Sequence, residues 1–146
     1  MRITYEEMVF ESSTPVKVNE ILKDVITDKH IACVCNNQVH ALDYEIREDA
    51  HLELLDTTSK QGRDVYIRGV MFIMGKAFED VCPNALLTVN YQLHNAMFCQ
   101  LDNMKVTDEL IAKVKKRMQE IIDLDLPITK TVMTIEEAKA FYLHSD

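Results

Sequence analysis

Residues 60–83, KQGRDVYIRGVMFIMGKAFEDVCP, decide how the chain is divided and what its second half is built around. From Asp64 to Val81 the apolar residues cover far more than one stripe of a helix, which is typical of a helix surrounded by other structure. They are Val65, Ile67, Val70, Met71, Phe72, Ile73, Met74, Ala77, Phe78 and Val81. The pattern predicts a long buried helix over 64–81. Lys60-Gln61-Gly62 predicts a boundary between two domains, residues 1–61 and 62–146.

The residues after this helix predict a hairpin and two further helices. Residues 86–93 and 96–101 have the composition of strands, with His94-Asn95 at the turn. Thr107 is expected to cap a helix that ends at Pro127. Its apolar face consists of Leu110, Val114, Met118, Ile121 and Ile122. The capping-box pattern Thr134-Ile135-Glu136-Glu137 predicts a short final helix.

The residues before the long helix predict a strand or hairpin and then a short helix. Residues 3–10 alternate loosely between apolar and polar, with Glu6-Glu7 near a turn. Thr14-Pro15 has the pattern of a helix N-cap followed by proline at the first helical position. Val18, Ile21, Leu22 and Val25 follow at helical spacing.

A second hairpin and one more strand are expected next. Residues 31–35 and 39–46 are β-rich runs on either side of Asn36-Asn37, and asparagine tolerates the positive φ of a tight turn. Residues 51–55 predict a further short strand. The predicted order of elements is that of a small ubiquitin-like β-grasp.

Composition and charge limit the function. The net charge of the 146 residues is −8, and residues 1–61 hold 6 Lys and Arg against 12 Asp and Glu. Residues 62–146 hold 10 against 12, so neither half has the basic excess of a general nucleic-acid binder. An acidic start and the lack of an apolar run of roughly 20 residues predict neither a signal peptide nor a membrane span.

The four cysteines predict a reducing, cytoplasmic setting. They are scattered, and the only close pair, Cys33 and Cys35, lies in a strand-like run where both side chains would face the same way. Free cysteine is commonly buried, whereas a metal site needs further soft ligands nearby. We therefore expect core packing and no metal at this pair.

Two resemblances cover almost the whole chain. Residues 14–61 resemble a TGS domain, the β-grasp module shared by threonyl-tRNA synthetases, certain GTPases and stringent-response enzymes. Residues 62–142 resemble the domain that follows it in threonyl-tRNA synthetase. The second resemblance rests on Cys82-Pro83, Ala96-Met97-Phe98-Cys99, Lys116-Arg117-Met118 and Thr134-Ile135-Glu136-Glu137-Ala138, in that order. It implies an α+β fold, a β-grasp followed by an editing-like domain.

The resemblance also implies that the editing site is broken. In the synthetase the long helix opens with a His-x-x-x-His pair, one helical turn apart. Counted back from Pro83, the matching positions here are Arg68 and Phe72. The Cys-x-x-x-His of the other half of that site is expected beyond this stretch, and neither arrangement occurs in the chain. No catalytic residue and no metal ligand are therefore predicted.

Residues 63–69, with Phe72, resemble the variant found ahead of the kinase domain in bacterial uridine-kinase-like proteins of the phosphoribulokinase/uridine kinase family. This implies a parent nucleoside kinase whose C-terminal domain uses ATP and Mg²⁺. The three glycines, Gly62, Gly69 and Gly75, form no phosphate-binding loop, so phosphoryl transfer cannot be assigned to these residues. No cofactor is expected in this chain.

Two sets of residues are candidates for ligand contact. Arg63, Tyr66 and Arg68 combine two guanidinium groups with an aromatic ring, which suits an anionic nucleotide. Lys113, Lys115, Lys116 and Arg117 form a basic row, either an anion surface for RNA or nucleotide phosphate or a solvated helix face. His40, His51 and His94 are expected to be surface or packing residues.

Three functions stay open from the sequence. The first is a non-catalytic regulatory or ligand-binding module of a nucleoside kinase, with the kinase domain itself as partner. The second is a degenerate tRNA-binding, editing-type module related to threonyl-tRNA synthetase. The third is a structural oligomerisation module. A nucleotide, RNA or a second copy of the chain is a candidate partner, and a membrane is not.

Overall fold

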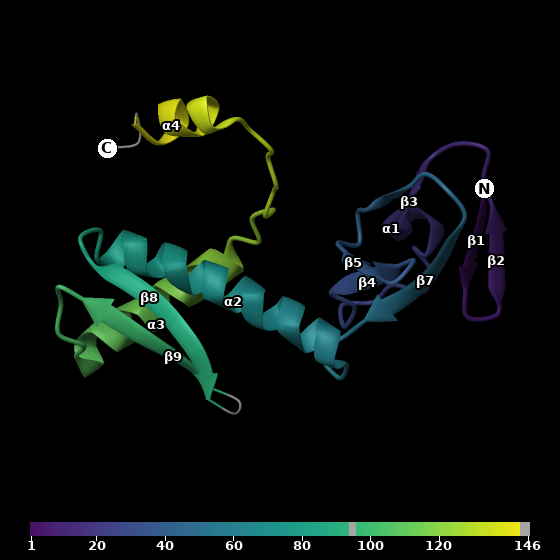
Figure 1. The fold of residues 1–146 in the computed structure, drawn as a ribbon. Helices are drawn as coiled ribbons and strands as arrows, with labels where there is room; N and C mark the ends of the chain where they lie inside the picture. Colours follow the sequence, from purple (N-terminus) through teal and green to yellow (C-terminus); the bar gives the residue numbers. More distant parts are fainter. Residues whose placement is uncertain (94–95, 144–146) are drawn as a thin grey trace.

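The computed structural model describes residues 1–93 and 96–143 and has the α+β class that the sequence predicts (Figure 1). The first half contains β1 (Arg2–Tyr5), β2 (Met8–Glu11), β3 (Val16–Lys17), α1 (Val18–Ile21), β4 (Ala32–Cys35), β5 (Gln38–His40), β6 (Glu45–Ile46) and β7 (Ala50–Leu55). The second contains α2 (Lys60–Val81), β8 (Leu86–Leu93), β9 (Ala96–Asp102), α3 (Asp108–Asp123) and α4 (Ile135–Leu143).

A mixed five-stranded sheet organises the first half in the order β2-β1-β7-β4-β5. Strand β1 is parallel to β7, with Ile3 opposite Ala50, and the other neighbours are antiparallel. A first hairpin, a helix, a second hairpin and a return strand are arranged in the order predicted from the sequence. The mixed sheet is consistent with the expected β-grasp.

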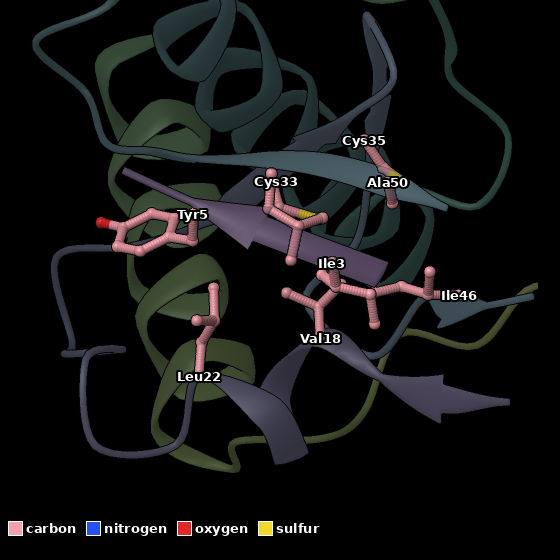
Figure 2. Close-up of a cluster of buried hydrophobic side chains, with 9 residues drawn as sticks. Ile3, Tyr5, Val18, Leu22, Cys33, Cys35, Ile46 and Ala50 are labelled. Atoms are coloured by element: carbon pink, nitrogen blue, oxygen red, sulfur yellow. The ribbon is translucent and has the colours of Figure 1, made fainter. Parts of the chain in front are cut away.

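One face of this sheet carries the main core of the protein (Figure 2). Alternate residues of a strand point to the same face, so Ile3 and Tyr5 of β1 belong to the same buried cluster as Cys33 and Cys35 of β4. Leu22, just after α1, packs against them and is fully buried. The remaining members of this cluster are Val18, Ile46, Ala50 and Leu52.

Two hairpin turns use residues with positive φ, which the sequence predicts for the second of them. Glu6 lies in the first turn (φ 49°), and Asn36 and Asn37 form the second (φ 48° and 67°). The amide of Asn36 also joins the two hairpin strands to the next one. Its Nδ2 donates to the carbonyl of Asp49 (3.0 Å), and its Oδ1 accepts from the backbone N–H of His51 (3.0 Å).

Two predictions in the first half are wrong. Thr14-Pro15 does not start a helix, because the next two residues pair as β3 with β6, and α1 begins only at Val18. The run over 39–46 is not one strand. The carbonyls of Leu42 and Tyr44 leave the sheet and accept from Asn19 N (2.8 Å) and Val18 N (3.0 Å). Both errors have one cause, the pairing of β3 with β6. It takes residues 16–17 from the predicted helix and residues 45–46 from the predicted strand.

Helix α2 begins four residues before the predicted start. Ser59 Oγ caps it by accepting from Gly62 N (3.0 Å). Gly62 therefore lies inside the first turn of the helix instead of in a boundary segment. A Cβ atom built on Gly62 would lie only 1.9 Å from the carbonyl oxygen of Asp56. Glycine is needed here because α2 approaches the backbone that follows β7.

The prediction that α2 is buried is wrong for the residues that the structure describes. Only Gly62 and Ala77 are buried, whereas Tyr66 is 54% and Phe72 64% exposed. Helix α3 and the β8–β9 pair cover one side, and at the N-terminal end Val65 packs against Ala32, Val34 and Leu55 of the sheet. The apolar residues on the other side of α2 are only partly covered within residues 1–93 and 96–143, where Phe72 and Ile73 line an open hollow.

The second half contains the predicted hairpin and amphipathic helix. Strands β8 and β9 are antiparallel, with Leu87 opposite Leu101, and the predicted turn His94-Asn95 lies outside the described residues. Thr107 Oγ1 caps α3 by accepting from Leu110 N (3.2 Å), as expected. Leu110 and Val114 of α3 form a small core with Ala77 and Cys82. The second half is thus held together by a much smaller core than the first.

The last part of the chain departs from the other elements (Figure 1). Helix α3 ends at Asp123, before Pro127, and Asp125 adopts a positive φ of 45°. The predicted capping box of α4 is present: Thr134 N donates to Glu137 Oε2 (2.7 Å), and Glu137 N donates to Thr134 Oγ1 (3.2 Å). Across the described residues, no helix combines the length and the apolar character needed to cross a membrane.

Candidate functional site

The first predicted set, Arg63, Tyr66 and Arg68, lies on the N-terminal half of α2 and is exposed. Successive residues of a helix are about 100° apart, so Arg63 and Tyr66 are about 60° apart, while Arg68 is about 160° from Tyr66. Arg68 also lies more than two turns from the start of α2, and its Nε donates to the carbonyl of Asp64 (3.2 Å). The three side chains do not converge on one ligand position, although Arg63 and Tyr66 share a face.

The positions of the expected histidine pair are exposed on α2. Arg68 and Phe72 lie one turn apart, as the resemblance requires. The ring of Phe72 lines an open apolar hollow with Ile121, Leu126 and Ile128. Within residues 1–93 and 96–143, no three His, Cys, Asp or Glu side chains are grouped closely enough to hold a metal ion. The absence of a metal ligand set stays a prediction for the whole chain.

Of the three histidines singled out from the sequence, His40 and His51 are described and make local contacts. The ring of His40 stacks on Tyr44, with centroids 3.7 Å apart. His51 Nδ1 lies 2.9 Å from Thr4 Oγ1, and its Nε2 lies 4.0 Å from Glu53. His94 is outside the described residues. Within the described residues, neither His40 nor His51 belongs to a group of side chains that could hold a metal ion.

Cys33 and Cys35 lie on the core face of β4. Burial raises the pKa of the Cys33 thiol to about 11, and burial also raises the pKa of Cys35. The Cys33 thiol is within donor distance of two carbonyls, those of His40 (3.7 Å) and Ala41 (3.5 Å). Because metals and electrophiles react with the thiolate, these protonated thiols serve packing.

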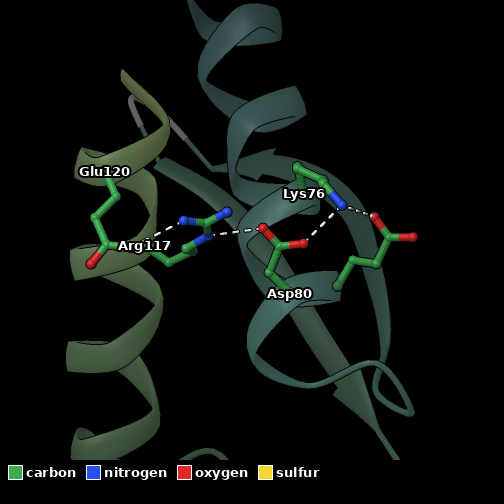
Figure 3. Close-up of polar contacts among 5 residues, drawn as sticks. Lys76, Asp80, Arg117 and Glu120 are labelled. Atoms are coloured by element: carbon green, nitrogen blue, oxygen red, sulfur yellow. Dashed lines mark hydrogen bonds and ion pairs between the residues drawn. The ribbon is translucent and has the colours of Figure 1, made fainter. Parts of the chain in front are cut away.

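Arg117 is held by carboxylates (Figure 3). Its Nε donates to Asp80 Oδ2 (2.8 Å) across the α2–α3 interface, and its Nη1 donates to Glu120 (3.1 Å). Asp80 also pairs with Lys76 (2.8 Å) on its own helix. These hydrogen bonds, led by that of Lys76, lower the pKa of Asp80. A phosphate would have to displace two carboxylates to reach Arg117, so the geometry favours a structural role for this residue.

We expect Asp80→Asn to lower the free energy of unfolding at pH 7 by about 0.5–1.5 kcal/mol, because the bridge to Arg117 lies at a partly exposed interface. Folding lowers the pKa of Asp80. The stabilisation by its carboxylate is therefore complete above the pKa of the unfolded state, near 4. It is lost as the pH falls through the lower pKa of the folded state. Urea denaturation at several pH values measures the difference. Glu79→Gln, which touches Lys76 alone in this network, is the control. A difference that persists unchanged at low pH would contradict the assignment.

The other lysines of the predicted basic row have different surroundings on α3. Lys116 is exposed, 3.9 Å from Glu120, whereas Lys113 lines a hollow of about 220 Å³ together with Lys105. Thr107, which caps α3, and Glu109, in its first turn, also line this hollow. Two lysines near the positive end of a helix favour a phosphate there, although Glu109 opposes it. Lys105 was missed from the sequence, because it precedes α3 and belongs to no charge pattern on the helix.

Comparisons with known proteins point to one enzyme class. No family model matches the chain. The threonine–tRNA ligase of Wolbachia sp. subsp. Drosophila simulans is 27% identical over 146 residues, which covers 97% of this chain and 23% of the ligase. That of Syntrophomonas wolfei is 26% identical over 133 residues, 90% and 21% of the two chains. That of Symbiobacterium thermophilum is 28% identical over 113 residues, 77% and 17%.

The chain spans about a fifth of the length of the curated relatives that it matches. The nucleoside-kinase parent, which the resemblance at 63–69 implied, receives no support from these relatives. Identity of about a quarter over most of its length makes this chain a homologue of the N-terminal region of threonine–tRNA ligases.

Proposed function

We propose that this chain is an RNA-docking module without editing activity, with a TGS-like first half and an editing-like second half. Homology to threonine–tRNA ligases along nearly the whole chain supports the relation to RNA. Arg68 and Phe72, at the positions of the expected histidine pair, support the loss of editing. Of the functions left open by the sequence, the degenerate editing-type module is therefore preferred.

The chemistry of these two side chains explains why editing is lost. An imidazole can ligate a metal or transfer a proton near neutral pH. The guanidinium of Arg68 stays protonated and offers no lone pair, and the ring of Phe72 has no polar atom. Docking of an RNA can persist without them, because affinity for nucleic acids comes largely from cations facing phosphates.

The second half is the side suited to phosphate contact. Acidic residues outnumber basic ones twofold in residues 1–61, whereas the two groups nearly balance in residues 62–146. Lys105 and Lys113 share one hollow beside the start of α3, and Lys116 is exposed farther along that helix. These three lysines replace the larger basic row as the proposed anion surface.

The test is the salt dependence of transfer-RNA binding. Removing two phosphate contacts with Lys105→Gln/Lys113→Gln should make the slope of log K against log salt shallower by about 1.4–1.8. Fluorescence anisotropy between about 50 and 200 mM salt measures it. Lys130→Gln/Lys139→Gln makes the same charge change elsewhere and should leave the slope close to wild type. Equal slopes in both double variants, or no binding at the lowest salt, would refute the proposal.

Two other functions remain hypotheses with their own tests. A regulatory module of a nucleoside kinase, acting with ATP and Mg²⁺ held by another domain, predicts that this chain binds a small ligand or the kinase domain itself, and calorimetric titration measures such binding. An oligomerisation module is favoured by exposed apolar side chains on the hairpin, where Tyr91 stacks on Phe98 with centroids 5.0 Å apart. Light scattering at several protein concentrations measures self-association.

A further inference from the structure

A second hollow, of about 250 Å³, lies between α2, α3 and the β8–β9 pair. Its walls are formed mainly by Met74, Phe78, Leu87, Leu101, Val114 and Met118. On α2, Met74 and Phe78 are about 160° and 120° from Phe72, so this hollow is separate from the face that carries Arg68 and Phe72. It is also separate from the Lys105–Lys113 hollow.

The residues that line this hollow favour an apolar ligand over water. A buried water needs two to four polar partners. The two uncharged polar side chains at this hollow are directed elsewhere: Gln100 Nε2 donates to Asp102 Oδ1 (2.8 Å), and the thiol of Cys99 is directed to the carbonyl of Met97 (3.9 Å). An apolar space without a guest loses dispersion contacts along its whole lining, which destabilises a small core. A hydrocarbon group therefore gains most from entering it.

Lys115 gives the hollow a charged edge. It is exposed and lines the same space, and within the described residues no carboxylate pairs with it. Its neighbours on α3 differ, since Lys116 faces Glu120 and Arg117 is held by Asp80. An ammonium group beside an apolar space is complementary to an anion with a hydrocarbon tail.

We propose that this hollow binds a medium-chain monocarboxylate, with the tail between Phe78 and Met118 and the carboxylate facing Lys115. The tail should dominate affinity, so lengthening hexanoate to octanoate should tighten binding roughly tenfold. The carboxylate adds less, because its partner is exposed to solvent. This inference does not depend on RNA docking.

Calorimetric titration with octanoate and 1-octanol separates the two contributions. Lys115→Gln should weaken octanoate about threefold to fivefold and leave octanol unchanged. Lys139→Gln, an equal charge change on α4 and outside the lining of this hollow, should alter neither. Equal octanoate affinity in Lys115→Gln and wild type would overturn the assigned orientation. No binding of octanoate or octanol to the wild type at millimolar concentration would overturn the site itself.

Cys99 reports directly on occupancy. It lines the hollow and is partly exposed, whereas Cys33, Cys35 and Cys82 are buried. Octanoate should slow alkylation of Cys99 by iodoacetamide in proportion to its binding, as measured by peptide mass spectrometry. Val106→Phe, at the exposed mouth, should abolish both this protection and the calorimetric heat. Binding without protection of Cys99, or undiminished in Val106→Phe, would place the ligand elsewhere and refute the proposal.

Discussion

Gly62→Ala is expected to lower the free energy of unfolding by about 2–4 kcal/mol. The new methyl carbon would lie 1.9 Å from the carbonyl oxygen of Asp56 and 2.9 Å from Ser59 Oγ. Backbone has to move to relieve the first contact, and the second displaces the hydroxyl that caps α2. Guanidinium denaturation followed by circular dichroism measures the loss.

Two matched controls lie in the same helix. Gly69 and Gly75 have nothing within 4 Å of an added Cβ. Alanine at either position should raise the free energy of unfolding by about 0.5–1 kcal/mol, because it restricts the unfolded chain and favours helix. A loss at Gly69 or Gly75 as large as that at Gly62 would show that α2 is sensitive along its length and that the close approach is not the cause.

Leu22→Ala should lower the free energy of unfolding by about 2–5 kcal/mol. The leucine side chain is fully buried between α1 and the five-stranded sheet, next to Ile3 and Cys33, so its removal leaves an unfilled space in the main core. Val9→Ala is the control, because Val9 is 52% exposed at the sheet edge, and it should cost less than about 1 kcal/mol.

Hydrogen exchange of Leu22→Ala, followed in both halves of the chain, tests whether the halves unfold together. If the α2 amides and the β-sheet amides lose hydrogen-exchange protection together in Leu22→Ala, the halves unfold as one unit. We expect this coupling because Val65 of α2 packs on the sheet cluster of Ala32, Val34 and Leu55. A variant as stable as wild type would contradict the assigned core.

The parts of the fold with strong local signals were predictable. Asn36-Asn37 combines a turn that needs positive φ with flanking β-rich residues, and Thr107 and Thr134 each precede a helix with its cap in place. The β3–β6 pair was not predictable, because two-residue strands carry no period. The exposure of α2 was also missed, because an apolar pattern shows that cover is favourable and not whether the chain supplies it.

The candidate site was less accessible from sequence. Arg63, Tyr66 and Arg68 are neighbours in the chain, but helical geometry turns Arg68 away from Tyr66. Lys105 and Lys113 are eight positions apart in the chain. They line the same hollow because the segment before α3 lies beside the first turns of that helix. Arg117 could be assigned to a charge row, but its partner Asp80 lies on another helix and leaves no mark in the local pattern.

Because α2 is long, small changes in its orientation near Gly62 produce large displacements at its other end. The helix has 22 residues and a length of about 33 Å, and it is joined to β7 by the four residues 56–59. A rotation of about 10° at this end would move the far end by about 6 Å, taking the helix as rigid at about 1.5 Å per residue. The position of the hairpin and α3 relative to the sheet is therefore sensitive to how closely α2 approaches the Asp56 carbonyl at Gly62.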